Sequence, residues 1–115
     1  MKRQKTVVTQ VDEHAVWLRD DAGRLLLHRE GGKRRQGLWK LPTRDAEEIS
    51  ALPVVDESRY MITRYRVRLI VHDGDGVRET FQTAADEVWQ EIDVVLALAM
   101  PSPFRRAIGR LIVER

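Results

Sequence analysis

The stretch Leu25-Leu26-Leu27-His28-Arg29, followed by Gly37-Leu38-Trp39-Lys40-Leu41-Pro42, decides how this chain begins to fold. The first segment predicts an apolar strand, and the second predicts a short strand that Pro42 ends. Between them, Glu30 to Gln36 reads as a loop with two glycines and three basic residues. An apolar strand, a basic glycine loop and a second short strand are therefore the starting point for predicting the fold.

The length and composition of the chain indicate a single globular domain. Its 115 residues allow one core, and 43% of them are hydrophobic, which excludes disorder as the main state. There is no apolar run of about 18 residues, so we expect no membrane partner. Met1-Lys2-Arg3-Gln4-Lys5 is not followed by the apolar segment of a signal peptide. Cysteine is absent, which excludes disulfides, thiolate metal sites and iron–sulfur clusters and predicts a cytoplasmic protein.

Charge is distributed unevenly although the net charge is only +2. Residues 58–71 contain four arginines and no acid, residues 29–40 contain five bases against one acid, and residues 85–93 contain four acids and no base. Clustered arginine suits contact with phosphate groups. An ordinary solvated surface explains the same clusters equally well.

Local patterns predict more strands than helices. Weak alternation predicts a strand over 5–10, and residues 13–19 and 24–29 read as a hairpin through a turn at 20–23. The other predicted elements are a helix over 43–49, a strand over 58–72, a turn at 73–76, strands over 77–83 and 87–90, and helices over 92–100 and 102–115. We therefore predict an α+β fold, a mixed β-sheet sandwich or half-barrel with short packed helices and a C-terminal helix.

Three segments together resemble a known family. They are the opening leucine and G-L-W-x-x-P segments, Ile62-Thr63-Arg64 before a strand, and an ending in which Trp89 precedes an alanine- and leucine-rich helix and Pro101-Ser102-Pro103. This pattern is similar to the C-terminal domain of MutY-type adenine DNA glycosylases, which has a Nudix-like fold without the hydrolase site. The resemblance implies an N-terminal strand or arm at 1–12 and a single Nudix-like domain over 13–115.

The resemblance implies a role in base excision repair. That family's domain helps to recognise 8-oxoguanine opposite adenine, so the implied partners are DNA, including duplexes with 8-oxoguanine, and a glycosylase catalytic domain. Ile62-Thr63-Arg64 stands where the family carries Phe-Ser-His or Phe-Thr-His. The catalytic half of such an enzyme is missing here, so we expect the chain to be either a fragment of a longer enzyme or a stand-alone relative, and not to be catalytic alone.

The Nudix catalytic box is absent. It resembles G-x5-E-x7-R-E-U-x-E-E-x-G-U, where U is aliphatic, and its glutamates bind magnesium. Around Glu47-Glu48, Thr43-Arg44 stands in place of Arg-Glu and Ser50 in place of glycine. We therefore expect no catalytic residues, no metal and no cofactor, and Glu47 and Glu48 read as a solvated helix face. Two alternatives stay open: a divergent Nudix hydrolase that uses Asp45, Glu47 and Glu48, and a protein-interaction module.

The predicted DNA-binding residues come from the arginine-rich strand and the basic loop. Arg64, Arg66 and Arg68 alternate with apolar residues, so we expect them in one row on the exposed side of a strand, opposite a buried Tyr65. The complete set is Thr63, Arg64, Arg66, Arg68, Lys33, Arg34 and Arg35. The alternative is that this row is only the solvent-exposed face of a sheet and binds nothing.

The remaining conspicuous side chains read as structural. The three histidines lack the spacing of a metal site. Trp17, Trp39 and Trp89 are predicted to belong to the core, as are Leu26 and Leu41, rather than to a base-stacking surface.

Overall fold

The computed structural model describes residues 8–31 and 37–115. The strands are β1 (Thr9–Trp17), β2 (Leu25–Arg29), β3 (Trp39–Lys40), β4 (Val54–Ile62), β5 (Tyr65–Asp73) and β6 (Glu87–Gln90). The helices are α1 (Ala46–Ile49), α2 (Ile92–Val95) and α3 (Ser102–Glu114), with a 3-10 turn η1 (Asp75–Val77). The predicted α+β class is confirmed. No helix within the described ranges is long and apolar enough to cross a membrane.

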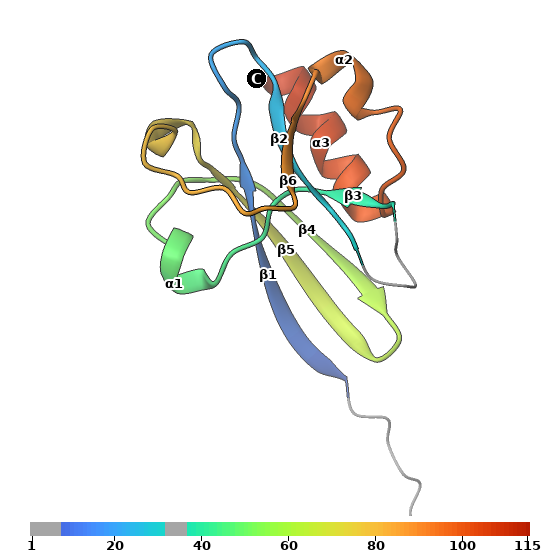
Figure 1. Ribbon diagram of the computed structural model, residues 1–115. Coiled ribbons are helices and arrows are strands. Elements are labelled where there is room, and N and C mark those ends of the chain that lie inside the picture. Colours follow the sequence, from blue (N-terminus) through green and yellow to red (C-terminus); the bar gives the residue numbers. More distant parts are fainter. Residues whose placement is uncertain (1–7, 32–36) are drawn as a thin grey trace, which may run out of the picture.

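The strands form two three-stranded sheets (Figure 1). One has the order β1-β5-β4, in which β1 runs parallel to β5 and β4 runs antiparallel to it. The other has the order β3-β2-β6, with both neighbours antiparallel to β2. The start of β1 and the tip of the β4–β5 hairpin project away from α2 and α3, so the outer part of the first sheet is exposed (Figure 1).

The core has a layer on each side of β2. Leu25 and Leu27 pack with Trp17 and the buried face of α3, whereas Leu26 packs in a second cluster with Ile49 of α1. All three leucines are fully buried, because successive side chains of a strand point to opposite faces and both faces are covered. Figure 1 shows α3 on one side of the strands and α1 on the other.

Helix α3 supplies one wall of the core. Phe104, Ala107, Ile108 and Leu111 are buried at the three- and four-residue spacing of a helical face. Pro101 occupies the N-cap position, one residue before the predicted cap, so the helix begins at Ser102 itself.

The first predicted hairpin is present only at its turn. An isolated bridge joins Arg19 to Leu25, and Asp20 accepts the backbone N–H groups of Ala22 and Arg24 through its carboxylate. Beyond the turn the two strands enter different sheets, and β1 pairs with β5 instead. β1 also begins at Thr9, so it continues through the expected boundary between residues 12 and 13.

The predicted strand over 58–72 is two strands. Residues 63–64 form the turn of the β4–β5 hairpin, with Thr63 at a φ of 53°. The predicted return strand over 77–83 is wrong, because the chain turns through η1 and then runs irregularly to β6. Asp75 explains the turn: its carboxylate accepts the N–H of Arg19, and its own N–H donates to Asp73. These bonds hold the backbone away from a strand path.

The predicted helix over 92–100 is only one turn long. Arg105 donates to the carbonyl oxygens of Leu96 and Leu98, and Ala99 accepts the N–H of Trp39. These contacts hold the segment after α2 in an irregular path that the local sequence pattern does not contain. α1 is likewise shorter than predicted, since Thr43 forms a bridge to Ala15 before the helix begins.

The residues predicted to form the core are not all equally buried. Trp17, Leu26 and Leu41 are fully buried, as predicted. Trp39 and Trp89 are half-buried and pack against the two core clusters.

We predict that Leu26→Ala lowers the free energy of unfolding by about 2–5 kcal/mol, because it removes a fully buried side chain between two covered layers. Val113→Ala is the control, since that side chain is 86% exposed and should change stability by less than about 0.5 kcal/mol. Urea denaturation measures both. Equal midpoints for the two variants would show that the layer between α1 and β2 does not support the fold.

Candidate nucleic-acid interface and the neighbouring cleft

The outer face of the β1-β5-β4 sheet carries an arginine face, which we define as Arg59, Arg66 and Arg68. Residues directly opposite each other in a sheet share a face. Arg68 lies between Asp12 of β1 and Arg59 of β4, and Arg66 lies beside Met61 of β4. The register therefore brings the three arginines onto one face, and Arg59 joins it although the sequence analysis did not include it in the DNA-binding set.

Arg68 is held by carboxylates. Its Nη2 and Nε lie 2.7 and 3.2 Å from the two carboxylate oxygens of Asp12, and its Nη1 lies 4.0 Å from Glu57. The hydrogen bonds from Arg68 lower the pKa of Asp12, and those same bonds raise the pKa of Arg68. Arg68 was predicted as a member of an exposed row of arginines, and the structure pairs it with Asp12 across the β1–β5 ladder.

Arg64 and Arg66 differ from Arg68 in their partners. Both are exposed, and neither forms an ion pair with any residue that the structure describes. Arg64 is the second residue of the hairpin turn rather than a strand residue, so the predicted row of three on one strand is reduced to Arg66 and Arg68. The side chain of Arg59 is 70% exposed, and its Nη2 lies 3.7 Å from Oε2 of Glu57.

The buried side of β5 confirms only part of the predicted alternation. Val67 and Leu69 are buried, but Tyr65 is 45% exposed, so its predicted burial is wrong. Tyr65 follows the turn directly and lies at the outer end of the hairpin, beyond the helices that cover the core. Lys33, Arg34 and Arg35 lie outside the described residues.

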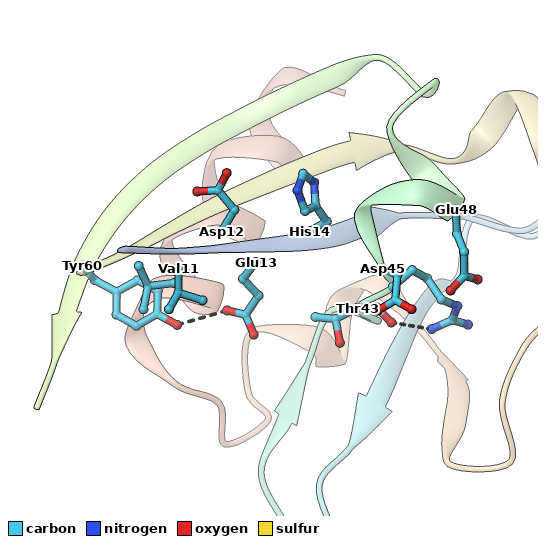
Figure 2. A pocket seen from close by; sticks show the side chains of 10 residues that line it. Val11, Asp12, Glu13, His14, Thr43, Asp45, Glu48 and Tyr60 are labelled. Atoms are coloured by element: carbon cyan, nitrogen blue, oxygen red, sulfur yellow. Dashed lines mark hydrogen bonds between the residues drawn. The ribbon is translucent and has the colours of Figure 1, made fainter. Parts of the chain in front are cut away.

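A cleft of about 430 Å³ lies between β1 and the segment that leads into α1 (Figure 2). One wall is the segment from Thr43 to Glu48, and the other is the first half of β1 with Tyr60 of β4. The Tyr60 hydroxyl donates to Glu13 across 3.0 Å. The full set of lining residues is Val11, Asp12, Glu13, His14, Thr43, Arg44, Asp45, Glu48, Tyr60 and Val67.

Arg44 anchors the cleft to the rest of the fold. Its two terminal nitrogens lie 2.6 and 2.7 Å from the carboxylate of Glu87, and its guanidinium stacks over Phe81 at 4.8 Å. Burial alone would raise the pKa of Glu87, but hydrogen bonds from Arg44 and from the N–H of Ala84 outweigh it and lower the pKa. The bond to Glu87 raises the pKa of Arg44. Both charges are therefore retained and mutually neutralised.

The buried histidine His72 fixes the role of His14. His72 Nδ1 lies 3.1 Å from the carbonyl oxygen of Leu52, and its Nε2 lies 2.9 Å from Nδ1 of His14. A carbonyl oxygen only accepts, so a neutral His72 carries its proton on Nδ1, and its Nε2 then accepts from His14. Neutral His14 therefore keeps its own Nε2 as a hydrogen-bond acceptor.

The carboxylates of the hydrolase alternative do not converge. Asp45 and Glu48 line the cleft, whereas Glu47 is exposed and outside it. Within residues 8–31 and 37–115, no three His, Asp or Glu side chains are placed to hold a metal ion. Exposure of Glu47 and Glu48 agrees with their prediction as a solvated helix face.

Known structures share this fold. A MutT protein from Methanosarcina mazei is 18% identical with a TM-score of 0.67, covering 96% of this chain and 98% of that one. A mutT/nudix family protein from Listeria innocua is 13% identical with a TM-score of 0.58, covering 96% and 95%. NrtR from Shewanella oneidensis, in a complex with a 27mer DNA, is 13% identical with a TM-score of 0.56, covering 86% of this chain and 58% of that one.

At these identities the similarities establish a Nudix-like fold and nothing finer. No protein-family model and no curated protein sequence matches the chain. The fold predicted from the opening segments is thus confirmed, while the narrower resemblance to the adenine glycosylase domain stays a prediction.

We predict that Glu87→Gln destabilises the protein by about 3 kcal/mol at neutral pH, because it leaves a largely buried Arg44 without its counter-charge. Since folding lowers the pKa of Glu87, its contribution is present above the unfolded pKa of about 4.3 and is lost as the pH falls through the folded value. The stability difference between wild type and variant should therefore shrink in acid. Urea titrations at several pH values measure it.

The control for that experiment is Glu79→Gln, which removes the same charge from an exposed position. A gap between wild type and Glu87→Gln that is independent of pH would mean that the Arg44–Glu87 pair does not carry the effect.

Proposed function

We propose that this chain is a nucleic-acid-binding domain built on a Nudix-like fold, and that DNA lies against the arginine face and the hairpin turn. The observation that carries the proposal is that Arg64 and Arg66 are exposed and form no ion pair among the described residues. Such guanidinium groups keep all of their donors for phosphate oxygens.

The sheet geometry supports contact with a nucleic-acid backbone. Arg66 and Arg68 are two residues apart on β5, about 6.6 Å at the usual strand rise, which is on the scale of phosphate spacing along one strand. Because Asp12 already binds Arg68, Arg66 is the main phosphate contact on the sheet and Arg68 contributes less. Arg59 adds a third, mostly exposed cation on the neighbouring strand.

The hairpin turn is the place for any recognition of a base. Thr63 and Arg64 occupy the positions where the resemblance implies contact with 8-oxoguanine opposite adenine. An arginine can donate to the O6 and N7 edge of a guanine, and a threonine hydroxyl can donate or accept. We include in the proposal a role in base excision repair, in which the turn contacts the lesion and a glycosylase catalytic domain is the partner.

The DNA complex of NrtR supports the proposal at the level of the fold. A protein with a region of similar structure is found bound to DNA. This similarity covers only 58% of NrtR and carries no residue correspondence, so the argument rests on the arginines of this chain.

A second candidate is a divergent hydrolase of nucleotides. The observation in its favour is that Asp45 and Glu48 line the cleft beside His14. Against it, no box glutamates follow the G-L-W-x-L-P segment, and among the described residues the acids do not form a metal-binding group.

We predict that Arg64→Ser and Arg66→Ser each weaken DNA binding and lower the slope of log K against log salt by about one. Arg64→Ser should reduce affinity more for 8-oxoguanine duplexes than for plain duplexes. Fluorescence anisotropy over a salt series measures both effects. Arg115→Ser is the control, because it removes an exposed arginine beside Asp73, at the end of β5 that is far from the hairpin turn. If the double Arg64→Ser/Arg66→Ser variant binds both duplexes as wild type does at low salt, the proposed function is wrong.

We also predict that the purified chain does not hydrolyse nucleoside diphosphates or triphosphates. Without converging carboxylates, magnesium cannot be held against a diphosphate. Phosphate and pyrophosphate release with and without magnesium measures this. Magnesium-dependent turnover that disappears in Glu48→Gln but persists in Glu79→Gln would support the hydrolase instead.

A further inference from the structure

Among the residues that the structure describes, nothing pairs with the outer edge of β1 along its first half. Thr9 donates its N–H to Arg64 beside β5, whereas the carbonyl of His14 and the N–H of Val16 bond to residues on the other side. Backbone groups alternate between the two sides of a strand, so those of Gln10 and Asp12 point to the outer edge. No backbone partner for them exists among residues 8–31 and 37–115.

A short segment of the chain already pairs with the outer edge of β1 near the end of that strand. Residues 42–44 run antiparallel to β1, with the bonds from Val16 N–H to Pro42 and from Arg44 N–H to His14. At Asp45 the chain turns away into α1. The cleft adjoins this path, because Val11 to His14 of β1 and the segment from Thr43 to Glu48 both line it (Figure 2).

The cleft is acidic after internal pairing is taken into account. Asp12 is bound to Arg68, and the arginine of the lining, Arg44, is bound to Glu87. Glu13, Asp45 and Glu48 remain as lining carboxylates that form no salt bridge with any described residue. Glu13 accepts a hydrogen bond from Tyr60, and Glu48 is attracted to Arg44 only through space. Since they do not converge on one point, they suit several cations along an extended chain better than a single ion.

His14 adds an acceptor to the same cleft. Its Nδ1 proton is donated to His72, whose tautomer is fixed by the Leu52 carbonyl, so neutral His14 offers only the lone pair of Nε2. The side-chain groups that remain available are therefore mainly acceptors, and the edge backbone supplies both donors and acceptors.

We propose that the open edge of β1 binds an extended, lysine- or arginine-rich segment of a partner protein as an added strand. The backbone of the segment pairs with Gln10 and Asp12, and its cations lie against Glu13, Asp45 and Glu48. Strand addition of this kind takes its affinity from main-chain hydrogen bonds and its specificity from alternate side chains. The site faces a different partner from the arginine face, because its charge repels nucleic acid.

The test is fluorescence anisotropy with a labelled short peptide of alternating threonine and lysine, compared with a threonine–glutamate peptide. The lysine peptide should bind and the glutamate peptide should not. Asp45→Asn/Glu48→Gln should weaken binding of the lysine peptide about three- to tenfold, as expected for exposed ion pairs. Both acids are exposed, so the variant should fold, which a melting curve checks.

A second pair of variants separates strand addition from charge attraction. Gln10→Pro removes one outward N–H while leaving the bonds to β5 intact, and Gln10→Ala is its matched control. Gln10→Pro should weaken peptide binding about fivefold, whereas Gln10→Ala should not, because one main-chain hydrogen bond is lost only in the first.

Equal binding by the two Gln10 variants, or equal binding of the lysine and glutamate peptides, overturns the proposal. Concentration-dependent dimerisation that is abolished by Gln10→Pro also overturns it, since the occupant would then be a second copy of the chain. The readout is separate from DNA binding, so failure here leaves the proposed function standing.

Discussion

The burial of β2 on both of its faces is the constraint on which the rest of the structure depends. A strand that exposes no face needs an apolar layer above and below it. Leu25 and Leu27 are covered by the α3 side of the core, and Leu26 is covered by the α1 side. The same requirement extends to the end of β1, where Ala15, Val16 and Trp17 are fully buried in succession. The two apolar layers, one on each side of β2, follow from these short segments.

The sequence predicts what local chemistry controls and misses what distant contacts decide. The buried leucines, the turn before β2 and the apolar face of α3 are visible as local patterns, and they are confirmed. The pairing of β1 with β5 instead of β2 joins residues that are far apart in the chain, so no local pattern contains it. The break at Thr63 was also missed, because the hydrophobic alternation continues on both sides of a turn that lacks glycine.

The sequence likewise predicted one part of the candidate site and missed another. Placement of Arg66 and Arg68 on one face followed from strand alternation, and the register adds Arg59 to that face. The pairing of Arg68 with Asp12 depends on which strand lies beside β5, so it could not be read from spacing. The cleft is also a product of distant contacts, since it is made by β1, β4 and the segment before α1. Charge along a sequence thus overstates the charge that the folded surface presents.

The backbone at Thr63 has a consequence for how this sequence can vary. A φ of 53° places a β-branched residue in a region that costs on the order of 1–2 kcal/mol and that glycine occupies freely. Random substitution filtered only for thermal stability would replace this threonine with glycine or asparagine. Among naturally occurring variants of the chain, the side chain found at position 63 therefore reports on selection that acts through something other than folding. A hydroxyl retained there across divergent sequences would mark the turn as a place of contact, and a drift to glycine would mark it as a simple connection.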